Sequence, residues 1–190
     1  MRVSREQAAL NRERIVATAS RLFREKGYDG IGVADLMKCA GLTHGGFYGH
    51  FASKEDLLAE ACGQAMSGAV ERWRGVLARA PRHPLGALAR YYLTPEHRDN
   101  PGAGCAVASL GPDVARVGEA VRQAMDAGLQ QQLALLAEAL QGTPAQKRRQ
   151  AIVAYASMVG GLLLARTVAD AQLSDEILAA VTAALERQEA

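Results

Sequence analysis

Apolar residues recur along the chain with a helical period. Four of them form one stripe of a 3.6-residue repeat near the N-terminus: Ile15, Ala19, Leu22 and Phe23. Gly27 follows in the position of a C-terminal glycine, so we expect a helix over about residues 6–26. No segment shows convincing β-alternation or an internal repeat. The pattern predicts an all-α chain of about nine helices.

Two short helices are expected next. Val33 to Ala40 has Asp35 in its first turn, and Gly41 ends it. Thr43 is a good N-cap for a second short helix over residues 44–50. Ser53 caps a longer helix that runs to about residue 79.

Proline and glycine mark the remaining boundaries. Thr143 and Pro144 have the sequence of a cap and a first helical position, and Ser174 is the expected cap of the last helix. Residues 94–104 have the composition of a loop, and 105–110 form a short apolar turn. The other expected helices cover about residues 84–93, 113–140, 144–169 and 174–188.

The helices at 33–40 and 44–50, joined by Gly41-Leu42-Thr43, form a predicted helix-turn-helix. In such a unit the second helix enters the DNA major groove. Three glycines, Gly45, Gly46 and Gly49, crowd into this helix at a cost of up to ~1 kcal/mol each. They indicate either close approach of the backbone to DNA or tight packing between helices.

Polar side chains around this second helix are of the types that reach phosphates and bases. We expect Phe47 and Phe51 to pack inward with Leu36 and Leu42, and Cys39 to be a small buried residue. His50 is either a phosphate contact or a structural histidine between aromatic residues. The candidate DNA-binding residues are Thr43, His44, Gly45, Gly46, Tyr48, His50 and Lys54, with Thr43 and His44 closest to base edges.

Composition narrows the class of protein. Apolar residues make up 49% of the chain and charged residues 22%, as expected of a folded protein. The net charge is +2, but residues 1–54 carry nine Lys/Arg against five Asp/Glu, which suits a phosphate-binding surface. Three cysteines without a CxxC motif argue against disulfides and against a zinc site.

The sequence predicts no catalytic residues, no cofactor and no metal. No Ser/His/Asp or Cys/His group is recognisable, so an enzyme on a helical scaffold is the weaker alternative. Met1–Gln7 lacks the apolar core of a signal peptide, and no run approaches 18 consecutive apolar residues. We therefore expect a cytoplasmic protein that does not interact with a membrane.

The run Gly41-Leu42-Thr43-His44-Gly45-Gly46-Phe47-Tyr48-Gly49-His50-Phe51-Ala52-Ser53-Lys54-Glu55-Asp56-Leu57 resembles the helix-turn-helix signature of the TetR/AcrR family. Upstream, Leu22-Phe23-Arg24-Glu25-Lys26-Gly27-Tyr28 is similar to the end of that family's first helix. The resemblance covers about residues 10–60. It departs at Gly49, where a larger residue is common, and at Gly32, where Ser or Thr usually caps.

This resemblance implies a homodimer formed by the last two helices as a four-helix bundle. It also implies a helix-turn-helix domain over residues 1–53 and a helical effector-binding and dimerisation domain over 54–190. The apolar faces of the last two helices agree, although they could instead pack within one subunit. The expected dimer residues are Ile152, Tyr155, Val159, Leu162, Leu163, Ile177, Leu178, Val181 and Leu185.

The family resemblance also implies an effector site among the middle helices, although plain core packing is the alternative for each residue. The candidates combine aromatic and adaptable apolar side chains: Met66, Val70, Trp73, Leu88, Tyr91, Tyr92, Cys105, Met125 and Leu129. Cys105 follows a flexible loop and starts a helical turn, where a thiol becomes more reactive. It resembles a Gly-Cys turn of electrophile-sensing family members, although a small buried cysteine is the alternative.

The expected function is that of a dimeric transcriptional repressor on a double-stranded, pseudo-palindromic DNA operator. A small molecule or a reactive electrophile would release it from the operator. A regulator switched only by redox chemistry at Cys105 is a variant of this interpretation.

Overall fold

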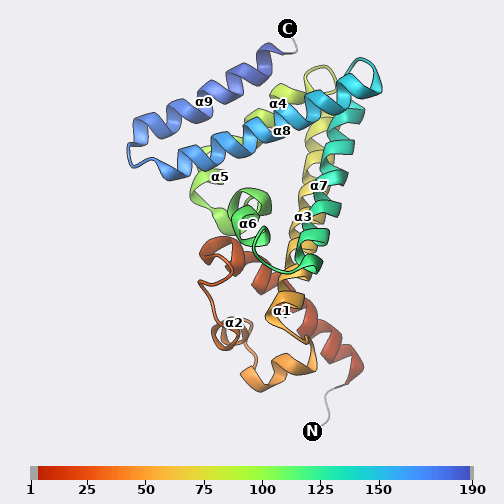
Figure 1. Ribbon diagram of the computed structural model, residues 1–190, viewed down its shortest axis with the longest axis vertical. Helices are drawn as coiled ribbons and strands as arrows, with labels where there is room; N and C mark the ends of the chain where they lie inside the picture. Colours follow the sequence, from red (N-terminus) through yellow and green to blue (C-terminus); the bar gives the residue numbers. More distant parts are fainter. Residues whose placement is uncertain (1–3, 189–190) are drawn as a thin grey trace. The chain divides into compact units, whose positions relative to one another are not determined.

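The computed structural model describes residues 4–188, and within them it contains helices and no strand (Figure 1). This confirms the predicted all-α fold. Nine α-helices and two 3-10 helices follow one another in this part of the chain: α1 (Arg5–Lys26), α2 (Val33–Cys39), η1 (His44–Gly49), α3 (Lys54–Arg79), α4 (Pro84–Tyr92), α5 (Pro95–Asp99), η2 (Pro101–Ala103), α6 (Ala106–Val114), α7 (Glu119–Ala139), α8 (Pro144–Thr167) and α9 (Ala171–Arg187). Residues 1–3 and 189–190, the ends of the two predicted domains, lie outside the described residues.

Several predicted helix ends are confirmed by their hydrogen bonds. The Ser53 hydroxyl accepts from the Asp56 amide at 3.0 Å at the start of α3. Thr143 and Gln146 form a reciprocal capping box at α8, with Pro144 in the first turn. Gly27 ends α1 with φ +77°, a conformation that side chains disfavour.

Other boundaries were predicted wrongly. The helix expected over 113–140 begins only at Glu119, as α7. The short apolar turn expected over 105–110 is instead part of α6, which continues through Pro112 to Val114. The expected loop over 94–104 contains α5, whose first turn is capped by the Thr94 hydroxyl. α9 begins at Ala171 with Asp170 as its cap.

Ser174 is therefore not the cap of the last helix. It is buried inside α9, and its hydroxyl donates to the Ala165 carbonyl of α8 at 2.7 Å. The Ser174 hydroxyl therefore finds its hydrogen-bond acceptor on a neighbouring helix and not at the terminus of its own helix.

The helices form two compact units that do not follow chain order. The first unit contains the described residues up to Met66 together with Pro101–Ala127. Its largest fully buried side chains include Ile15, Phe23, Leu36, Met37, Phe47, Leu57 and Leu58. The predicted functional boundary at residue 53 stays a prediction.

The second unit contains Ser67–Asn100 and the described residues from Gly128 onward. Trp73 is 2% exposed, with its ring centroid 5.2 Å from that of Tyr155 and 6.5 Å from that of Tyr92. α8 and α9 lie side by side (Figure 1). Gly161 permits close packing there, since an added Cβ would lie 3.0 Å from Val181 Cγ2.

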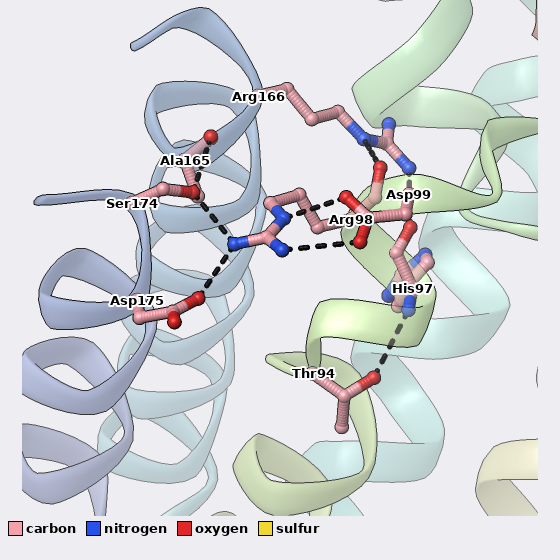
Figure 2. A network of polar contacts seen from close by, with 8 residues as sticks. All are labelled: Thr94, His97, Arg98, Asp99, Ala165, Arg166, Ser174 and Asp175. Carbon is pink, nitrogen blue, oxygen red and sulfur yellow. Dashed lines mark hydrogen bonds and ion pairs between the residues drawn. The ribbon is translucent and has the colours of Figure 1, made fainter. Parts of the chain in front are cut away.

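Short helix α5 is fastened to the α8 and α9 pair by arginines (Figure 2). The Arg98 guanidinium donates to the Ser174 hydroxyl at 2.9 Å and to Asp175 Oδ1 at 2.7 Å on α9. Arg166 of α8 donates to the carbonyls of Arg98 at 3.0 Å and His97 at 2.7 Å. Multiple charge-assisted bonds to backbone and carboxylate fix where α5 lies within the unit.

By length and composition alone, α8 is apolar enough to span a membrane. Helices in the core of a folded protein can have the same length and composition. Here α8 packs against α9, and Arg166 near its end binds backbone carbonyls of the same unit. We therefore interpret its apolar character as protein packing.

His97 should make the protein less stable in mild acid. Burial lowers the pKa of its imidazole below the ordinary 6.5, and the cations Arg166 and Arg72 act in the same direction, while the hydrogen bond to the Tyr92 carbonyl opposes the shift. The folded chain thus keeps His97 neutral, while the unfolded chain gains a proton as the pH falls below about 6.5, which favours unfolding. The loss is limited to about 1.4 kcal/mol per pH unit.

Chemical denaturation of wild-type protein and His97→Gln between pH 7.5 and 5 measures this effect. The wild-type free energy of unfolding should fall more steeply with acidification than that of the variant. Parallel pH profiles would show that His97 does not carry the effect.

Candidate nucleic-acid interface

α2 and η1 are joined by a tight turn that fits the predicted helix-turn-helix. The Gly41 amide donates to the Lys38 carbonyl at 3.0 Å, and the Leu42 amide donates to the Met37 carbonyl at 2.9 Å. Gly41 has φ +67°, so a side chain at this position would be strained. These two bonds and the glycine direct the chain from one helix into the next.

The second helix of this unit is a 3-10 helix, which corrects the expectation of an α-helix over 44–50. The Gly46 amide donates to the Thr43 carbonyl at 3.0 Å, and the His50 amide donates to the Phe47 carbonyl at 2.9 Å. Thr43 is extended at the start of the helix, but its hydroxyl makes no cap hydrogen bond. Glycine-rich segments have low helix propensity, which favours this short form.

η1 has a buried side and an exposed side. Phe47 is 1% exposed, and its ring centroid lies 5.7 Å from that of Phe51, which is also buried. The other side presents Thr43, His44 and Tyr48, and Tyr48 is 69% exposed. An exposed tyrosine held edge-on to a buried phenylalanine, at 5.2 Å between centroids, suits contact with a partner.

The glycines of η1 are not required by packing within the chain. A Cβ added at Gly45 or Gly49 would meet nothing within 4 Å. At Gly46 it would make ordinary contacts, 3.6 Å from Thr43 Oγ1 and 3.8 Å from Met37 Cε. This weakens the alternative of tight helix packing and favours close approach to a surface outside the chain.

His50 follows the last residue of η1, and Lys54 is the first residue of α3. His50 is half-buried, with its ring 6.4 Å from that of Phe51. The Lys54 ammonium donates to the Tyr28 carbonyl and lies 4.2 Å from the centroid of the Tyr28 ring. Burial lowers the pKa of Lys54, opposed by the nearby Asp29 carboxylate. Lys54 thus already has a structural role, and its contact with phosphate stays a prediction.

Two long-range contacts involve the end of α1 and the loop that follows it. The Tyr28 amide donates to Asp113 Oδ2 of α6 at 3.0 Å. Arg24 donates to the Gly102 carbonyl of η2 at 2.9 Å through Nε. Sequence reasoning missed both contacts, because no local pattern links residues so far apart in the chain.

The cysteines differ in their surroundings. Cys39 is exposed at the end of α2, which corrects the expectation that it is buried. Cys62 is buried, and this raises the pKa of its thiol to about 11. Cys105 is 8% exposed and is the N-cap residue of α6.

Most of the predicted effector residues are buried. Leu129 is half-buried, and Tyr91 is 41% exposed, so Tyr91 lies at the surface of its unit and not in the core. The Tyr155 hydroxyl, near Trp73, donates to the buried Gln132 at 3.1 Å. The buried candidates belong to both units, and their convergence on one pocket stays a prediction: Met66, Val70, Trp73, Leu88, Tyr92, Cys105 and Met125.

The predicted dimer residues divide by exposure. Ile152 and Leu163 are each 46% exposed on α8. Val159, Ile177 and Val181 are half-buried. The remaining four are buried within the chain itself, as the alternative of packing in one subunit predicts: Tyr155, Leu162, Leu178 and Leu185.

Residues 15–61 match the model of the bacterial regulatory proteins of the tetR family. The HTH-type transcriptional repressor NemR of Escherichia coli K12 is 29% identical over 169 residues, which cover 82% of this chain and 83% of that protein. The crystal structure of the reduced form of E. coli NemR has a TM-score of 0.78 at 27% identity, covering 93% and 95% of the two chains. A TetR transcriptional regulator from Chloroflexus aurantiacus has a TM-score of 0.76 at 25% identity, covering 94% and 95%.

The helix-turn-helix with its exposed reading side and these matches define a DNA-binding transcriptional regulator. Residues 15–61 thus carry the DNA-binding domain of the tetR family, as the signature in residues 41–57 predicted, and the whole chain is similar to regulators of that family.

Proposed function

We propose that the chain is a dimeric, cytoplasmic repressor that binds a pseudo-palindromic operator and leaves it when an effector binds. One observation carries the DNA-binding part of this proposal: η1 buries Phe47 and turns Thr43, His44 and Tyr48 outward. Thr43 and His44, both exposed, would read base edges. Tyr48, His50 and, after release from Tyr28, Lys54 would bind phosphates.

The proposed dimer uses the exposed apolar side of α8. Leu163 and Leu164 are 46% and 57% exposed, and Ile152 and Val153 are each 46% exposed. Leu173 on α9 adds a further exposed leucine at 42%. Such a cluster on a long helix favours burial against a second copy, which would align two reading units on one DNA molecule.

Release from DNA would follow from movement of α6. Asp113 of α6 holds the Tyr28 amide, and Lys54 holds the Tyr28 carbonyl, so this one residue connects α6 to the loop before α2 and to the start of α3. An effector that prefers a displaced α6 by ~2–3 kcal/mol would lower DNA occupancy tens-fold or more. We assign no catalytic role to the chain.

Cys105 is the proposed point of entry for a reactive electrophile. It is the N-cap residue of α6, the helix that carries Asp113. Addition of an electrophile to a thiol that is only 8% exposed requires α6 to shift. NemR, the E. coli relative, has been crystallised in a form described as reduced, which supports a redox-dependent state.

Replacing Cys105 by serine should leave DNA binding intact and abolish the response to electrophiles. The test is a reporter driven by the region upstream of the gene, with and without a thiol-alkylating compound. Cys62→Ser is the matched control, because burial raises the pKa of the Cys62 thiol to about 11 and this thiol should not contribute to the response. Induction that persists in Cys105→Ser would leave a non-covalent effector as the signal.

A further inference from the structure

A ladder of polar side chains runs along one side of α1 to the helix-turn-helix. The Gln7 side-chain Nε2 donates to Asn11 Oδ1 at 3.1 Å, and Arg14 Nη2 donates to the same oxygen at 3.5 Å. These residues stand at i, i+4 and i+7 and share one helix face. The contact with Asn11 helps to orient the Arg14 side chain.

The Arg14 guanidinium lies beside the turn that joins α2 to η1. A Cβ built on Gly41 would lie 4.0 Å from Arg14 Nη1. The turn leads directly to Thr43 and His44, the proposed base readers. Arg14 itself is exposed.

The charge of Arg14 is not neutralised within the described residues, unlike that of neighbouring arginines on α1. Arg12 forms a bidentate ion pair with Glu60, and Arg21 forms an ion pair with Glu25 at 3.0 Å. Arg14 has instead the neutral Asn11 as its partner. The adjacent carboxylate, Glu13, lines the separate groove of about 420 Å³ between α1 and α3.

Lys38 adds a second cation to the same region. It is exposed near the end of α2, and its carbonyl accepts the Gly41 amide of the turn. The Arg14 guanidinium is held in place but is not neutralised by a carboxylate, and Lys38 is a second cation near the same turn. Such a site is suited to bind the negatively charged phosphodiester of DNA.

We propose that Arg14 binds a backbone phosphate of DNA and sets the position of η1 on the duplex, with Asn11 as its positioning residue. This inference rests on the proposed function. It adds to the reading unit a contact from α1 that neither the sequence signature nor the η1 glycines indicate. Gly32 and Gly49 lack side chains that could bind phosphate, whereas Arg14 supplies one beside the turn at Gly41.

Binding measured against salt concentration tests this contact. Fluorescence anisotropy would follow full-length protein on two duplexes of equal length, one from the region upstream of its gene and one of random sequence. Arg14→Gln should weaken binding to both about tenfold at ~150 mM salt, because a phosphate contact is independent of sequence. The slope of log K against log salt should become shallower by about 0.9 per protomer.

The control variants separate charge from geometry. Arg21→Gln removes an equal charge from α1 at a neutralised position, so both affinity and slope should stay as in wild type. Arg14→Lys should keep the slope, and Asn11→Ala should keep it with about a threefold loss of affinity. If Arg14→Gln matched Arg21→Gln in slope and affinity, this inference alone would fail. Absence of wild-type binding to either duplex would overturn the proposed function as well.

Discussion

Replacing Phe47 by alanine should destabilise the reading unit by about 3–5 kcal/mol and abolish specific DNA binding. Phe47 is 1% exposed and packs against Phe51, so its loss leaves a cavity under a 3-10 helix that contains three glycines. A penalty of this size is a large share of the 5–15 kcal/mol that holds a typical domain together. Chemical denaturation and binding to the upstream duplex measure both effects.

Tyr48→Ala is the matched control, because Tyr48 is the next residue on the same helix and is 69% exposed. It should leave the free energy of unfolding nearly unchanged and weaken DNA binding at least tenfold, since the lost contact is with DNA and not with the core. Loss of stability in Tyr48→Ala, or full binding by Phe47→Ala, would contradict the two-sided description of η1.

Replacing Leu163 and Leu164 together by glutamate should dissociate the proposed dimer. Both leucines are exposed on α8, so the substitutions do not disturb the core of one chain, but they would place charges in a buried interface. A monomer contacts one half-site, so affinity for the operator should fall at least about a hundredfold. Sedimentation and anisotropy measure the two effects.

Leu10→Glu is the corresponding control, since Leu10 is 53% exposed on α1, away from α8 in the chain. The Leu10→Glu variant should have the same molecular mass in solution as the wild-type dimer. A double variant at Leu163 and Leu164 that stays dimeric would show that the second copy binds elsewhere.

Local sequence patterns predicted much of this fold. The stripe that includes Ile15 and Phe23, the terminal Gly27 and the cap at Ser53 all concern residues within one or two helical turns of each other. Such interactions leave a direct signature in the sequence. The exposed and buried sides of η1 were predicted for the same reason.

The remaining features depend on contacts between distant segments. The end of α6 at Val114 follows directly after Asp113, which accepts from the Tyr28 amide, and nothing in the helical pattern predicts this contact. Lys54 was expected to bind phosphate, and the fold in addition brings its ammonium to the Tyr28 carbonyl, to which it donates a hydrogen bond. Arg14 was overlooked because its position relative to Gly41 is visible only in three dimensions.

The most direct test of the central claim is binding of the full-length protein to the region upstream of its gene. At ~150 mM salt, with excess random-sequence competitor, we expect a specific complex protected over a pseudo-palindromic site. Thr43→Ala should change which bases of that site are preferred, since Thr43 is a proposed contact to base edges. Absence of any complex that survives the competitor would contradict the assignment of residues 41–54 as the DNA-reading surface.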